Sequence, residues 1–240
     1  MFTIARSRRV ATGLPVAAAC AVLAMSLTGC SIGGDPSSDS LSYDAGGPAN
    51  TLRVKNLGGR IEVVAGDQST IKVTETYTYT DGKPKTTHSL QNNELKLEAT
   101  GCGSVGMGGK CDVRYKVEVP RDTATYLEGS GGSITVTGLS GTTYAKIGGG
   151  GVEVKDSTAK EVTAHSGGGG VILQFNGVPD KVEATTGGGS VSVKVPKGPY
   201  AVDTGDSGGR LSHVTVDVDS SSPHKIKATT GGGSVLVEAN

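Results

Sequence analysis

The octapeptide ATTGGGSV occurs twice, at Ala184–Val191 and again at Ala228–Val235. Each copy leads into an alternation of aliphatic and polar residues, VSVKV after the first turn and VLVEA after the second. Glycine adopts positive φ freely, and because it lacks a Cβ it allows two backbones to approach closely. A repeated glycine turn that is followed by period-2 alternation predicts strand–turn–strand units that recur along the chain.

Looser copies of this turn extend the repeat in both directions. Alignment on a Gly-Gly pair, a small or polar residue and an aliphatic residue gives successive spacings of 18, 19, 20, 20 and 24 residues. The stretch LGGRIEV places Ile61 in the same role. The aligned aliphatic residues are Ile134, Val152, Val171, Val191, Leu211 and Val235. We expect the turn glycines to lie at equivalent corners with positive φ; they are Gly132, Gly150, Gly169, Gly188, Gly209 and Gly232.

Strand, glycine corner, strand and loop, repeated about every twenty residues, predict an all-β fold. The expected architecture is a single β-solenoid, similar to a parallel β-helix, over residues 50–240. Residues 126–240 would form the regular coils, and residues 50–125 a less regular N-terminal part or cap. In that part, alternation on both sides of Asp81-Gly82 predicts a hairpin turn.

The first 30 residues have the layout of an export signal. Three arginines within residues 6–9 precede an apolar run at residues 10–27, which is barely long enough to span a membrane. The run ends in LTGC at 27–30, which resembles the bacterial lipobox. The resemblance implies that a signal peptide, residues 1–29, is cleaved and that Cys30 carries a diacylglyceryl group. With a further acyl chain on the freed amine, this lipid would anchor the protein to the membrane.

Composition limits the remaining possibilities. Residues 30–49 are rich in Ser, Gly, Asp and Pro, and we expect them to form a flexible tether. The chain has 39 glycines, two phenylalanines and no tryptophan, which predicts a core of small β-branched side chains. Without the signal peptide, 20 basic and 23 acidic residues remain, with no clustered basic surface for nucleic acid.

Two cysteines, Cys102 and Cys111, lie within the predicted domain. In an exported protein an isolated pair is most simply a disulfide. A metal or redox site is the alternative, but the spacing differs from CxxC and no histidine is near in the sequence.

The order of VKNLGGRIEV, a cysteine-bearing loop, VRYKVEVPRDTATYLEGSGGSITV and glycine-rich repeats resembles the bacterial "putative adhesin" family. The resemblance covers roughly residues 50–240. It implies an exported β-repeat domain, and it transfers no catalytic residues. Some relatives are associated with envelope-stress systems.

Several motifs point to chemistry that their surroundings do not support. The GxGxxG match at 101–106 has strands expected on both sides, where a dinucleotide site needs a strand and a helix. GDSGG at 205–209 copies a serine-protease motif, but it lies among repeats. Asp203 and Asp206 could serve a polysaccharide-cleaving enzyme, or cap a turn. The histidines (His88, His165, His213 and His224) show no metal-ligand spacing, and the glycine turns give only a remote match to calcium-binding repeats.

Tyr77 and Tyr79 share one face of an expected strand. They could contact a sugar, although we expect them to cover the edge of a small core.

We therefore expect a non-catalytic lipoprotein, lipid-anchored at the extracytoplasmic face of the bacterial membrane. It would serve in adhesion, interaction or scaffolding, with an envelope protein or polysaccharide as its partner and without a cofactor or metal. The alternatives are a β-helical enzyme that acts on polysaccharide and an accessory or sensor lipoprotein of an envelope-stress pathway.

Replacement of the lipid-bearing cysteine tests the anchor. Cys30→Ser should move the protein from the membrane fraction into the medium, or leave it unprocessed, because the thioether cannot form. Cell fractionation with mass analysis of the N-terminus measures both outcomes. Membrane retention of a normally matured Cys30→Ser variant would contradict the lipobox interpretation.

Overall fold

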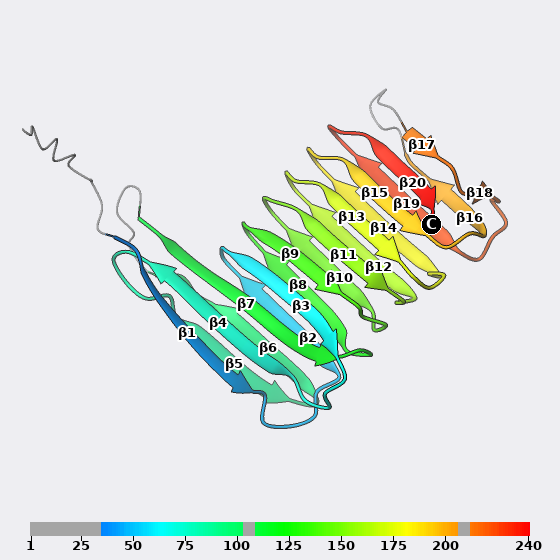
Figure 1. Ribbon diagram of the computed structural model, residues 1–240. Helices are drawn as coiled ribbons and strands as arrows, with labels where there is room; N and C mark the ends of the chain where they lie inside the picture. Colours follow the sequence, from blue (N-terminus) through cyan, green and yellow to red (C-terminus); the bar gives the residue numbers. More distant parts are fainter. Residues whose placement is uncertain (1–34, 103–108, 206–211) are drawn as a thin grey trace, which may run out of the picture. The chain divides into compact units, whose positions relative to one another are not determined.

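The computed structural model describes residues 35–102, 109–205 and 212–240. These residues belong to one compact unit, Ile32–Asn240, and their regular elements are all β-strands, as expected. They form two ten-stranded mixed sheets (Figure 1). The described ranges contain no helix that is long and apolar enough to cross a membrane.

Sheet A and sheet B are each defined here by their order of strands in space. Sheet A consists of β1 (Ser37–Asp44), β4 (Lys72–Tyr79), β7 (Cys111–Pro120), β3 (Arg60–Gly66), β9 (Ser133–Thr137), β11 (Val152–Ser157), β13 (Val171–Phe175), β15 (Val191–Val195), β20 (Val235–Ala239) and β17 (Ser212–Val214). Sheet B consists of β18 (Asp217–Val218), β16 (Pro199–Asp203), β19 (Lys225–Thr230), β14 (Lys181–Thr186), β12 (Glu161–Ser166), β10 (Thr143–Ile147), β8 (Ala124–Gly129), β2 (Thr51–Asn56), β6 (Glu94–Ala99) and β5 (Thr86–Gln91).

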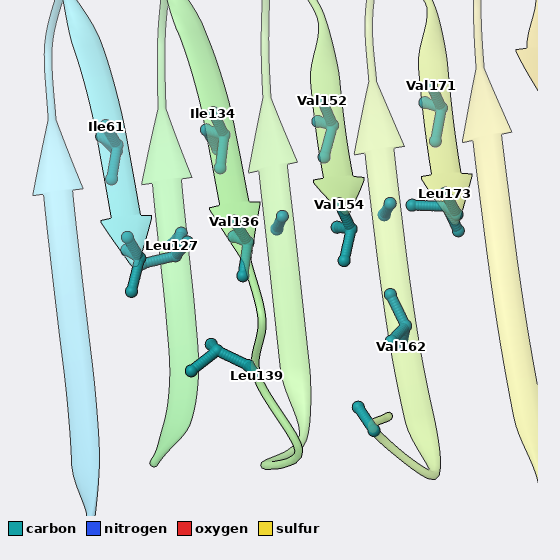
Figure 2. Packing of buried hydrophobic residues seen from close by; sticks show 14 of the residues in the cluster. Ile61, Leu127, Ile134, Val136, Leu139, Val152, Val154, Val162, Val171 and Leu173 are labelled. Carbon is teal, nitrogen blue, oxygen red and sulfur yellow. The ribbon is translucent and has the colours of Figure 1, made fainter. Parts of the chain in front are cut away.

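The aliphatic residues aligned in the sequence form one buried row across sheet A. Parallel pairing places them opposite one another on successive strands, and each is at most 1% exposed. Figure 2 shows part of this row, with residues of sheet B facing it. The row contains Ile61, Ile134, Val152, Val171, Val191 and Val235.

A second buried row on sheet B lies on the inner face of that sheet. The row runs from Leu97 through Val54 to Leu127, and the strands that follow contribute an alanine at the same register position: Ala145, Ala164, Ala184 and Ala228. Small side chains on one sheet and β-branched side chains on the other leave room for a narrow core only. The scarcity of aromatic residues in the sequence reflects this core.

The two exact octapeptides are neighbours in space although they are far apart in sequence. Ala184 pairs with Ala228, and Val191 pairs with Val235. The intervening strands β16, β17 and β18 lie beyond the second copy, so β19 and β20 are inserted between strands that precede them in the chain. The expectation that the repeats stack in sequence order, with the Leu211 copy between the other two, is therefore wrong. Gly209 and Leu211 themselves lie outside the described residues.

The N-terminal part shows the same kind of insertion. β2 and β3 lie between β6 and β7 on one side and β8 and β9 on the other. As a result, β2 and β3, like β19 and β20, have neighbours on both sides, and the edges of the sheets are formed by β1 and β17 in sheet A and by β5 and β18 in sheet B.

The stacked glycine turns bring backbones into contact. A Cβ at Gly132 would lie 1.8 Å from the carbonyl oxygen of Gly59, and one at Gly150 would lie 1.7 Å from that of Gly132. Farther along, a Cβ at Gly189 would lie 2.5 Å from the carbonyl of Gly169. Real Cβ atoms do not approach a backbone this closely, so these positions accept only glycine.

Positive φ is confined to some of the turns. Gly132 and Gly150 have φ of 87° and 101°. The φ values of Gly169, Gly188 and Gly232 lie outside the left-handed region, so the expectation of equivalent positive-φ corners is wrong for them. In these later turns glycine is needed for the close approach of backbones.

A hydroxyl group accompanies each of the later turns. Thr186 Oγ1 donates to the carbonyl of Gly169 at 2.6 Å and accepts the N–H of Gly189 at 3.3 Å. Thr230 Oγ1 likewise donates to the carbonyl of Gly189 in the neighbouring turn and accepts the N–H of Gly233 in its own turn. The second threonine of ATTGGGSV therefore joins two consecutive turns through their backbones. At the same register position the earlier strands have Gly129 and Ile147, and their turns use positive φ instead.

Two further expectations about the N-terminal part need correction. Residues 37–44, within the predicted tether, form strand β1, which pairs with β4 along its whole length. Asp81-Gly82 does not form a hairpin, because β4 and β5 on either side of it belong to different sheets. The hairpin instead joins β5 to β6 through Asn92 and Asn93, which both have positive φ, as a two-residue primed turn requires.

A pair of glycine substitutions tests the close approach of backbones. Gly189→Ala should lower the free energy of unfolding by about 1–3 kcal/mol, because the neighbouring atoms belong to the backbone and cannot rotate away. Gly168→Ala, where a Cβ would meet nothing within 4 Å, should change it by less than about 0.5 kcal/mol. Chemical denaturation compares the two variants. Equal, small effects would mean that the stacked turns are looser than described.

Candidate functional site

The structure keeps the sequence-predicted polar candidates apart. His88 lies on β5, His165 on β12 and His213 on β17, while His224 Nδ1 lies 2.9 Å from the carbonyl oxygen of Pro179. Within the described ranges, no three His, Cys, Asp or Glu side chains are grouped as metal ligands would be.

The remaining candidate motifs have structural roles where they are described. Asp203 Oδ1 accepts the N–H of Gly205 at 2.9 Å and so caps a turn. Asp206 and Ser207 lie outside the described residues, as do residues 103–106 of the GxGxxG match. Cys102 and Cys111 form the expected disulfide, with an S–S distance of 2.02 Å.

A buried carboxylate, which sequence reasoning missed, lies near the N-terminal end of the core. Glu75 on β4 is 1% exposed, and its oxygens accept hydrogen bonds from Tyr43 at 2.6 Å, from Thr86 at 2.6 Å and from Tyr77. We call these four residues the N-terminal polar cluster. As expected, Tyr77 is buried at the edge of the core, where Tyr79 packs partly buried.

Burial governs the titration of this cluster. Burial and the hydrogen bond to Glu75 raise the pKa of Tyr77 to about 12. The same two causes raise the pKa of Tyr43, and burial raises the pKa of the neighbouring Tyr115. The three phenols therefore remain neutral over the physiological range, so that Tyr43 and Tyr77 can donate to the carboxylate.

The outer face of sheet B presents a different arrangement, a row of rings and cations across adjacent parallel strands. Tyr126 on β8 pairs with Tyr144 on β10, and their ring centroids are 6.4 Å apart. The guanidinium of Arg53 on β2 lies 4.6 Å from the Tyr126 centroid, and His165 on β12 meets Tyr144 edge-on at 6.2 Å. We call these four half-buried side chains the aromatic row.

Two adjoining surface depressions follow the aromatic row on the side of the glycine turns. One, of about 330 Å³, crosses β2, β8 and β10 and includes Lys55, Glu128 and Lys146. The other, of about 440 Å³, is lined by Tyr144, His165 and again Lys146. Because they share Lys146, they form one shallow groove that crosses four strands.

Charge in this groove is partly uncompensated. Arg53 Nε lies 3.1 Å from Glu94, and Lys55 lies 4.0 Å from Glu98. Among the described residues, Lys146 and Glu128 have no ion-pair partner, although they stand opposite each other on β10 and β8. An exposed ammonium and an exposed carboxylate therefore border the tyrosine rings and can form hydrogen bonds with a polar ligand.

A third depression on the C-terminal side of sheet B lacks this combination. It has a volume of about 370 Å³ and is lined by three lysines, Lys181, Lys225 and Lys227, together with aliphatic residues such as Val218. Lys181 is already paired with Glu161 at 2.8 Å, and no aromatic ring lines the depression. The groove beside the aromatic row is therefore the better candidate for a binding site.

Comparison with known proteins gives structural likenesses alone. No family model matches the chain, and no curated protein does.

Solved structures called "putative adhesins" are similar to it. A "putative cell adhesion protein" of Clostridium sporogenes has 12% identity and a TM-score of 0.44, and the match covers 86% of this chain and 100% of that one. A "putative adhesin" of Bacteroides fragilis has 12% identity and a TM-score of 0.37, covering 87% and 100%. A "putative lipid binding protein" of Parabacteroides distasonis has 12% identity and a TM-score of 0.28, covering 85% and 98%. The Bacteroides fragilis structure carries the name of the family that the sequence resembles.

A signal for the aromatic row was present in the sequence. Thr-Tyr occurs at 125–126 and again at 143–144, one repeat apart, and each tyrosine occupies an outward position of its strand. Alignment on the glycine turns alone concealed it. Arg53 and His165 could be placed beside the tyrosines only once the order of strands was known.

Alkaline titration tests the N-terminal polar cluster. The folded state keeps the Tyr77 proton up to a pKa of about 12, whereas the unfolded chain loses it near the ordinary value of about 10. The contribution of Tyr77 to the free energy of unfolding should therefore be fully present below pH ~10 and be lost as the pH rises toward 12. In urea denaturation over this interval, the stability of Tyr77→Phe should fall less steeply than that of the wild type. Identical slopes for the two proteins would contradict the assignment.

Proposed function

We propose that this protein is a non-catalytic, lipid-anchored component of the bacterial envelope that binds a glycan through the aromatic row of sheet B. The observation that carries the proposal is the groove that Tyr144 lines together with Lys146 and Glu128, which have no ion-pair partner among the described residues, with the ring of Tyr126 next to Tyr144. Aromatic rings contact the apolar C–H faces of sugars, and charged groups bind their hydroxyls. Both kinds of contact are available along this groove.

The repeats form a β-solenoid in this proposal. Two features support it: each unit contributes one strand to each sheet, and the strands of successive units pair in parallel and in register. The glycine turns between the sheets also stack on one another. Such stacking creates a flat, extended outer face, and repeat proteins use faces of this kind to bind long partners.

Anchoring at the extracytoplasmic face of the membrane rests on the sequence. The basic start, the apolar run and LTGC at 27–30 support lipidation of Cys30, and the disulfide supports an oxidising compartment. In this proposal the protein holds or organises polysaccharide at the cell surface, which is a role in adhesion or scaffolding.

The groove favours binding over cleavage. A glycosidase needs two carboxyl groups that flank the scissile bond. Glu128 is the one carboxylate among the described residues that line the groove. The residues opposite it on the adjacent strands are Lys55 and Lys146, and His165 lies one strand beyond Lys146.

Truncation of the tyrosines tests the proposal. In the soluble mature chain with Cys30→Ser, Tyr126→Ala and Tyr144→Ala should each weaken binding of purified cell-wall oligosaccharides about 5- to 30-fold, as loss of a central aromatic contact does. Ile172→Ala is the matched control, because it removes an exposed apolar side chain from the outer face of sheet A. Titration calorimetry measures affinity, and a reducing-end assay on the same mixtures detects cleavage.

Two results would contradict the proposal. Equal affinities of the two tyrosine variants and Ile172→Ala would remove the aromatic row from the binding site. A rise in reducing ends that disappears in Glu128→Gln would favour the enzyme alternative.

A further inference from the structure

The two ends of the described sheets differ in how their edges are protected. At one end, sheet A finishes with β17, of three residues, and sheet B with β18, of two. At the other end, sheet A finishes with β1, of eight residues, all paired with β4 without a bulge. Short strands, bulges, prolines and lysines normally protect an exposed edge from pairing with another chain. β1, with the sequence SSDSLSYD, is long and has no bulge, proline or lysine, and its charged residues are the two aspartates Asp39 and Asp44.

The inward side of β1 is also left uncovered. Leu41 stands opposite Glu75, which is buried, so the leucine points toward the interior side of sheet A. Leu41 is nevertheless 49% exposed, because among the described residues no strand of sheet A lies beyond β1. An unprotected backbone edge and a half-exposed leucine therefore occur on the same strand.

We propose that β1 is a self-association edge, where β1 of a second copy of this chain adds in antiparallel orientation. Residues directly opposite each other in an antiparallel pair point to the same face of the sheet. The two-fold axis must therefore lie midway between the two copies of one residue of β1, so that this residue faces its own copy. An isologous contact of this kind closes after two subunits. Sheet A of one copy then continues into sheet A of the other.

Of three positions of the axis near the middle of β1, the side chains favour Leu41. An axis at Leu41 places the two exposed leucines against each other and Asp39 opposite Tyr43 of the partner subunit. An axis at Asp39 would oppose two carboxylates, and an axis at Ser40 would place Asp39 against Leu41 of the partner subunit. The Leu41 register buries apolar surface and separates like charges, which favours a second copy as the occupant.

This inference is independent of the glycan proposal, because β1 and the aromatic row belong to different sheets. Its test uses the soluble mature chain with Cys30→Ser and sedimentation velocity over a range of protein concentrations. The wild-type β1 should give a monomer–dimer equilibrium. Leu41→Asp, which opposes two charges at the axis, should weaken dimerisation at least tenfold, while the urea midpoint shows whether the variant remains folded.

Cysteine cross-linking tests the register. Leu41→Cys should form a covalent dimer on mild oxidation, because the axis brings the two thiols together. Ser40→Cys, on the opposite face of the same strand, and Val218→Cys, which is 57% exposed at the other end of sheet B, should cross-link at least tenfold more slowly. A chain that is monomeric at every concentration would overturn the proposal. Unchanged association of Leu41→Asp, or equal cross-linking of the three cysteine variants, would do so too.

Discussion

Contact between backbones at the stacked glycine turns is the constraint on which the rest of the structure depends. Each turn lies so close to the one before it that a Cβ would overlap a carbonyl group, as at Gly150 and Gly189. The two sheets can be in register only when the turns that connect them are in register. In the later repeats, Thr186 and Thr230 reinforce this contact by bonding to two turns at once. The turn residues thereby hold the strands of both sheets in register, and the small inward side chains of those strands keep the core narrow.

The register also explains how a surface site can arise on a repeated scaffold. Because strands of sheet B pair in parallel without slippage, outward residues at equivalent positions become neighbours. Tyr126 and Tyr144 are adjacent for this reason, with Arg53 on one side of them. A change in a single repeat adds one group to the row without disturbing the core, since inward and outward positions alternate.

Periodicity was sufficient to predict the strands and the inward residues of the regular repeats. The aligned row from Ile61 to Val191 was correct because each member follows a glycine turn and is the first or second residue of a strand. Periodicity could not give the order of the repeats in space. In the alignment the Leu211 copy separates the two octapeptides, and the insertion of β19 and β20 next to β14 and β15 depends on long-range pairing. The φ values of the glycines could not be predicted either. The turn after Thr186 is hydrogen-bonded to the threonine hydroxyl, whereas the turn after Ile147 has a glycine with positive φ.

The irregular N-terminal part was predicted less well, for local reasons. Residues 37–44 are rich in serine and aspartate, which is typical of a linker, and they become a strand because β4 offers a free edge. Asp81-Gly82 has the composition of a hairpin turn, but Asn92-Asn93 forms the hairpin. Glu75 gave no signal, since a glutamate between two threonines resembles an exposed strand residue. Its burial depends on hydroxyl groups contributed by three different strands.

The insertion of β19 and β20 has a consequence for biogenesis. Strands β19 and β20 separate β14 and β15 from β16 and β17, so this end of the two sheets cannot be completed before β19 and β20 have been synthesised. A chain that stopped after β18 would leave β16 and β17 without their partners, and β14 and β15 would present an open template. Such a truncation would thus expose an aggregation-prone edge and make the product a substrate for proteases.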